Sequence, residues 1–240
     1  MKTAIQNPEY LYLSTDSNGT VCGCNQDWYP TLWQRRAGCG PTTASNLLIY
    51  HLRAGHLALP QKIERADDGL RLMEEVWHFV TPTAMGVHTP GIFEQGLRNF
   101  FRQNALSVST RSLRIPRRHH LRPSLAETVD FIRTGLSLDG PVAFLNLANG
   151  TVRKLDPWHW VTITALDEQN EGAVELEICD NLNYFTMSLH EWYETTSRGG
   201  GFVYLTATLP QLDPTSASDS EALEFEVDAG PVGSNLGHIG

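Results

Sequence analysis

Helical and extended patterns are segregated along this chain of 240 residues. Apolar side chains recur at the spacing of amphipathic helices in the ranges 42–53, 70–80, 92–103 and 124–132, with one strand-like alternation at 106–113. After residue 140 the chain changes to short apolar, β-branched runs, at 141–147, 158–166, 173–179, 184–188 and 201–208. Helices first and strands second predict an α+β domain with an antiparallel sheet.

The C-terminal segment differs in composition from the rest of the chain. Residues 211–240 contain six acidic residues and no Lys or Arg, so they carry −6 of the net charge of −9 and leave −3 for residues 1–210. The segment also lacks periodicity and holds few large apolar residues. We therefore predict one folded domain over residues 1–210 and a flexible acidic tail over 211–240. The near-neutral body points to no particular class of partner.

The sequence gives no sign of a membrane or of export. No run approaches the roughly 18 apolar residues of a membrane span, and no apolar stretch follows Lys2 as in a secretory signal. We expect a soluble, cytoplasmic protein. Cys22, Cys24, Cys39 and Cys179 are too few for a disulfide-built scaffold, so four free thiols are predicted. Cys22 and Cys24 offer only two of the about four ligands of a closed zinc site, so no metal or cofactor is expected.

Cys39 is the first candidate for a chemical role. It stands between Gly38 and Gly40 where the first long helix should begin, and Pro41 suits the first turn of that helix. A helix N-terminus carries partial positive charge, which favours a thiolate. The two glycines would let the backbone come close to whatever the sulfur attacks. The alternative is a small buried cysteine at a tight turn.

A thiolate nucleophile needs a base, and the base needs a group that orients it. His159 lies at the start of one predicted strand, and Asp180 lies at the end of the next. Antiparallel neighbours bring such positions side by side, so the pattern predicts that His159 and Asp180 meet. Each residue also has a structural alternative. His159 could be a strand residue whose ring is hydrogen-bonded within the fold, and Asp180 could be an aspartate that forms a turn.

Three short motifs carry a resemblance to a known family. They are GCGPT at residues 38–42, WHWVT at 158–162 with Asp180 after it, and GGGFVY at 199–204. In this order they resemble the papain-like cysteine peptidases, and more narrowly the peptidase C39-like group, over roughly residues 26–205. The resemblance implies a papain-like fold, in which an N-terminal helical part packs on a C-terminal antiparallel sheet with the active site in the groove between them.

The resemblance also implies roles for individual residues. Cys39 would be the nucleophile, His159 the general base and acid, and Asp180 the residue that orients the imidazole. The family uses a glutamine upstream of the cysteine to bind the oxyanion. Gln34 is the preferred candidate, because an oxyanion donor must lie close to the N–H of the nucleophile, and Gln26 is the alternative.

These residues predict a cysteine peptidase or amidase that acts on peptide or amide bonds through a thioester acyl-enzyme. Acyl or peptidyl transfer by the same triad is one alternative, and a catalytically silent scaffold that binds a peptide or polyanion is another. Loops 81–91 and 104–123 are expected to form the walls of the groove. The predicted substrate-binding residues are Trp158, Gly38, Gly40 and His88.

Two further groups of side chains have alternative interpretations. The basic cluster between residues 111 and 122 has no nucleic-acid-binding motif and no aromatic side chains between its arginines. We therefore expect a solvated loop and no binding of nucleic acid. The cluster comprises Arg111, Arg114, Arg117, Arg118 and Arg122 with His119 and His120. Four tryptophans near the motifs are candidates for lining a cleft or for packing in the core, namely Trp28, Trp33, Trp158 and Trp160.

Overall fold

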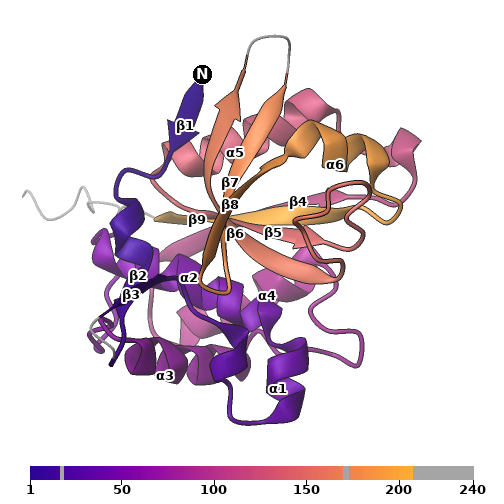
Figure 1. The fold of residues 1–240 in the computed structure, drawn as a ribbon. Coiled ribbons are helices and arrows are strands. Elements are labelled where there is room, and N and C mark those ends of the chain that lie inside the picture. Colours follow the sequence, from indigo (N-terminus) through magenta and orange to yellow (C-terminus); the bar gives the residue numbers. More distant parts are fainter. Residues whose placement is uncertain (17–18, 170–172, 208–240) are drawn as a thin grey trace, which may run out of the picture. The chain divides into compact units, whose positions relative to one another are not determined.

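The computed structural model describes residues 1–16, 19–169 and 173–207. Residues Met1–Leu209 form one compact unit, whose described part is drawn in Figure 1. The predicted acidic tail over 211–240 lies outside the described residues. None of the helices in the described ranges is long and apolar enough to cross a membrane.

An antiparallel sheet of seven strands organises the described part of the chain. Strand β1 (Lys2–Ala4) pairs with the end of β6, and β2 (Tyr12–Ser14) pairs with β3 (Thr20–Cys22) in a separate ribbon. The other strands lie in the order β4 (Val108–Ile115), β9 (Gly200–Ala207), β5 (Val142–Asn146), β6 (His159–Glu168), β7 (Val174–Asp180) and β8 (Asn183–Ser188).

Helices cover both faces of this sheet (Figure 1). One face carries α2 (Cys39–Arg53), α3 (Ala66–Trp77) and α4 (Pro90–Gln103), and α1 (Leu32–Ala37) directly precedes α2. The other face carries α5 (Leu125–Ser137) and α6 (Leu189–Thr195). Three short 3-10 helices complete the described elements: η1 (Pro8–Leu11), η2 (Gln26–Trp28) and η3 (His119–Leu121).

The core follows from the alternation of side chains along the central strands. In β5, Val142 and Phe144 join the apolar cluster under α5 and α6, whereas Ala143 and Leu145 join the cluster under α2, α3 and α4. Every residue of β5 is buried, because a sheet between two helical layers needs apolar side chains on both faces. This burial explains why the strand patterns read as nearly continuous apolar runs.

The predicted α+β class with an antiparallel sheet is confirmed. The expected helices at 42–53, 92–103 and 124–132 correspond to α2, α4 and α5, and the expected strands after residue 140 correspond to β5–β9. The helix expected at 70–80 is displaced, since α3 begins at residue 66 and ends at 77. Helices α1 and α6 were not predicted, because six or seven residues are too few to show a helical period.

The expectation of four free thiols is wrong. Cys22, the last residue of β3, forms a disulfide with Cys179 on β7, and Cys24 and Cys39 are the free cysteines. The two partners are 157 residues apart in the sequence, so no local spacing indicates the pairing. The disulfide ties the N-terminal segment to the strand that ends in Asp180.

The basic cluster is not a single surface. Arg111 and Arg114 are exposed on β4 but, three residues apart in a strand, they point to opposite faces. Arg122 is half-buried, and its guanidinium donates hydrogen bonds to backbone carbonyls that include those of Tyr193 at 2.6 Å and Thr196 at 2.7 Å. Arg122 therefore fastens the loop after β4 to α6, which is a structural role.

Candidate active site

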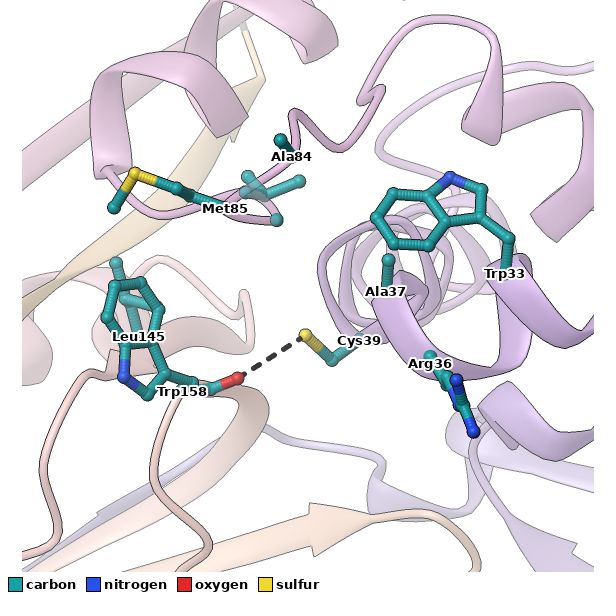
Figure 2. Close-up of a pocket in the computed structure, with 10 residues that line it drawn as sticks. Trp33, Arg36, Ala37, Cys39, Ala84, Met85, Leu145 and Trp158 are labelled. Carbon is teal, nitrogen blue, oxygen red and sulfur yellow. Dashed lines mark hydrogen bonds between the residues drawn. The ribbon is translucent and has the colours of Figure 1, made fainter.

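Cys39 is the first residue of α2, the helix that packs against the centre of the sheet. The preceding residue, Gly38, ends α1 and accepts the hydrogen bond of the Thr42 N–H at 2.9 Å, which closes the first turn of α2. The Cys39 side chain is half-buried, and its Sγ faces the backbone carbonyl of Trp158 at 4.0 Å (Figure 2). The sulfur thus stands at the N-terminus of α2, as the sequence predicted.

The glycines beside Cys39 serve the packing of the protein. A Cβ on Gly38 would meet the Gln34 carbonyl oxygen and, at 2.6 Å, the ring of Tyr29, and a Cβ on Gly40 would lie 2.8 Å from Val87. Protein atoms therefore fill the space that the sequence analysis assigned to an approaching substrate. The two glycines allow α1 and the loop at Val87 to pack tightly around Cys39.

His159 and Asp180 lie on neighbouring strands. His159 begins β6 and Asp180 ends β7, and the antiparallel register that pairs Thr162 with Cys179 brings the two side chains together. The His159 Nε2 atom lies 2.9 Å from each carboxylate oxygen of Asp180. Asp180 thus faces Nε2 of the ring, and Cys39 lies close enough to the same ring to influence its pKa.

The charge on His159 depends on both partners. Burial of the ring alone lowers its pKa, but hydrogen bonds to Asp180 and Cys39, together with their charges, outweigh this effect and raise the pKa of His159 from its ordinary 6.5 to about 10. The ring therefore holds its proton at neutral pH, with the Cys39 side chain beside it. A thiolate and an imidazolium in contact form the ion pair that a thiol nucleophile requires.

The loop before β6 places Trp158 next to the sulfur. Trp158 has a φ of 56°, in the left-handed region that a tryptophan rarely adopts, and its carbonyl turns toward Cys39. Asn146 fixes this loop, since its Nδ2 donates to the Asp156 carbonyl at 2.6 Å while its Oδ1 accepts from the indole of Trp192 at 2.8 Å. Backbone strain held by such anchors is common at functional sites.

A cleft of about 380 Å³ opens beside Cys39 (Figure 2). Large apolar side chains with substantial exposure form its walls, namely Met85, Trp33 and Trp158, which are 58%, 51% and 40% exposed. The loop that carries Met85 is held to the sheet by the Trp160 indole, whose Nε1 donates to the Val87 carbonyl at 2.6 Å. The remaining lining residues are Arg36, Ala37, Ala84, Gly86, Val87 and Leu145.

The structure brings some of the predicted residues to this cleft and not others. Trp158 lines it, as does part of the loop 81–91, whereas no residue of 104–123 is among the lining residues. His88 does not line the cleft, because its Nδ1 turns back toward the Gly86 carbonyl at 3.3 Å. Trp160 is buried against Phe93 in the core. Arg36 and Leu145 were not expected at the cleft, because their positions depend on tertiary packing, and Met85 was expected only as part of the loop 81–91.

The two candidate oxyanion donors occupy different surroundings. The Gln34 side-chain oxygen accepts hydrogen bonds from the Thr31 hydroxyl at 2.8 Å and the Thr31 N–H at 3.3 Å, so the side chain serves as part of the N-terminal cap of α1. Gln26 donates from its Nε2 to the Arg35 carbonyl and from its backbone N–H to Asn181 Oδ1, both at 3.1 Å. Gln26 thus lies between the helix before Cys39 and the turn after Asp180.

Within the described ranges, no group of three or more His, Cys, Asp or Glu side chains is arranged to hold a metal ion. Comparison of the sequence with protein-family models finds no match, and comparison with curated proteins finds none either. Any functional assignment therefore rests on the arrangement of Cys39, His159, Asp180 and the cleft beside them.

Proposed function

We propose that this protein is a papain-like cysteine peptidase or amidase that cleaves a peptide or amide bond through a thioester acyl-enzyme. The observation that carries the proposal is the position of the His159 ring, whose Nε2 lies 2.9 Å from both carboxylate oxygens of Asp180 and whose pKa is also raised by the nearby Cys39. Thiol catalysis requires a nucleophile, a base beside it and a group that orients the base. The cleft beside the sulfur supports the proposal by offering room for a substrate.

The reaction follows from these contacts. The Cys39 thiolate adds to the carbonyl carbon of the substrate, and the carbonyl electron pair moves onto oxygen. His159 donates its proton to the leaving nitrogen as the C–N bond breaks, which leaves a thioester on Cys39. His159 then takes a proton from water, whose oxygen attacks the thioester and releases the acid. An amine in place of water would give transfer by the same steps.

We assign the side-chain donor of the oxyanion hole to Gln26, because Gln26 lies between the segments that carry Cys39 and Asp180, whereas Gln34 caps α1. Gln26→Ala is expected to lower kcat by about 10²–10³-fold, the usual effect of losing one oxyanion donor. Gln34→Ala is the matched control and is expected to keep kcat while it costs about 1 kcal/mol of stability through the lost cap. Steady-state kinetics and thermal melts of both variants measure this, and the reverse ranking in kcat would contradict the assignment.

The pH profile is expected to report the charge of Asp180. Since His159 carries a raised pKa of about 10, kcat/KM of the wild type should fall as the pH rises through that value and the imidazolium loses its proton. Asp180→Asn keeps a hydrogen-bond acceptor but removes the charge, so the alkaline limb should move down by about 1–3 pH units. A profile that does not change in Asp180→Asn would show that Asp180 does not set the charge of His159.

A further inference from the structure

Each aromatic wall of the candidate cleft has an arginine beside it. Trp33 and Arg36 both come from α1 and line the same side of the cleft. Figure 2 shows this pair on one side of Cys39 and Trp158 on the other. On that second side the guanidinium of Arg198 lies over the indole of Trp158, 5.5 Å from the ring centre. A tryptophan with an arginine next to it therefore stands on each side of the sulfur: Arg36 is among the lining residues, and Arg198 lies over the Trp158 indole.

Both arginines are available to a ligand. Arg36 and Arg198 are exposed, and neither has an ion pair or a side-chain hydrogen bond to another residue in the described part of the chain. The neighbouring Arg35, by contrast, donates to the backbone carbonyls of Tyr29 and Pro30. The Arg198 guanidinium, which lies over the Trp158 indole, and that of Arg36 have N–H edges that match the two oxygens of a carboxylate.

The arginines at the cleft are not explained by a positive net charge of the protein. Residues 1–210 carry a net charge of −3, and none of the residues that line the cleft is acidic. The nearest catalytic carboxylate, that of Asp180, is paired with His159. The charge at the cleft is thus opposite in sign to that of the body, which favours an anionic ligand.

We infer that the cleft selects acidic peptides. Arg36 binds a substrate carboxylate on one side of the bond to be cleaved, and Arg198 binds a second carboxylate on the other side. The apolar walls formed by Trp33, Met85 and Trp158 hold the apolar side chains between these two anchors. The role of this peptide as substrate rests on the proposed function, whereas its binding does not require turnover.

Binding to the Cys39→Ala protein tests the inference without cleavage. The probes are two acetylated, amidated heptapeptides of the same Leu-, Phe- and Gly-based sequence, one with two glutamates and the other with two glutamines in their place. Tryptophan fluorescence gives the signal, since Trp33 and Trp158 line the cleft. We expect the glutamate peptide to bind at least about tenfold more tightly at low salt. Equal affinities would overturn the inference.

The arginines are then replaced one at a time in the same background. Arg36→Gln and Arg198→Gln are each expected to reduce the preference for the glutamate peptide by about three- to tenfold. Arg102→Gln, an exposed arginine in the last turn of α4 outside the cleft, is the matched control and should leave the preference unchanged. An unchanged preference in both Arg36→Gln and Arg198→Gln would overturn the inference, as would an equal loss in the control.

Digestion of a mixed peptide library by the wild type separates the two proposals. Cleavage sites enriched in Asp or Glu on either side of the broken bond support the inference, and cleavage without such enrichment overturns it while the proposed peptidase activity stands. Absence of cleavage, together with glutamate-selective binding that Arg36→Gln abolishes, would overturn the proposed function and still support an acidic ligand for the cleft.

Discussion

Cys39→Ala is expected to lower kcat/KM for peptide hydrolysis by at least about 10⁴-fold, to the level that binding and oxyanion stabilisation provide without a nucleophile. The fold should be kept, because Cys39 is half-buried at a helix end and loses only its sulfur. The measurement is the rate of product formation from a cleaved library peptide, with thermal melts to confirm that the variant is folded.

The other free cysteine provides the control for this experiment. Cys24 is fully buried, and burial raises the pKa of its thiol to about 12, so it stays a neutral packing group at physiological pH. Cys24→Ala should therefore keep kcat/KM within about threefold of the wild type and lose only stability, as expected for a shortened core side chain. A comparable loss of activity in the two variants would argue against Cys39 as the nucleophile.

Removal of the disulfide has the largest expected effect on stability. Cys22→Ala combined with Cys179→Ala should lower the free energy of unfolding by about 3–5 kcal/mol, because the bond closes a loop of 157 residues and restricts the unfolded chain. Urea denaturation of the double variant, and of the wild type with and without reductant, measures this difference. An unfolding free energy within about 1 kcal/mol of the wild type would contradict the expected stabilisation.

The same disulfide also lies close to the catalytic groups. Cys179 directly precedes Asp180, and Cys22 lies four residues before Gln26, whose N–H bonds the turn after Asp180. We therefore expect the double variant to lose activity at temperatures where it is still folded. A disulfide is typical of proteins that mature in an oxidising compartment, which weighs against the cytoplasmic location expected from the sequence.

The sequence predicted the parts of the site that depend on local pattern. Cys39 was placed at a helix start from the residues around it, and His159 and Asp180 were expected to meet because antiparallel neighbours join a strand start to a strand end. The choice between Gln26 and Gln34 depends on which segment packs beside Asn181, a tertiary contact that spacing along the chain does not encode.

The remaining features depend on contacts between distant parts of the chain. The partner of Cys22 lies across the fold on β7, and the wall of the cleft at Met85 is held by a hydrogen bond from Trp160 to Val87. Neither contact leaves a periodic signal in the sequence. The strands and longer helices could be predicted because burial on defined faces imposes a period on their side chains.

The rate at which Cys39 reacts with iodoacetamide at pH 6 is the most direct test of the paired thiolate. We expect Cys39 to be alkylated at least about tenfold faster than a simple thiol at this pH, and Cys24 to stay unmodified in the folded protein. In His159→Ala the rate of Cys39 should fall to that of an ordinary thiol. If Cys39 reacts equally slowly in both proteins, the sulfur and the imidazole do not form an ion pair, and the proposed catalytic site is wrong.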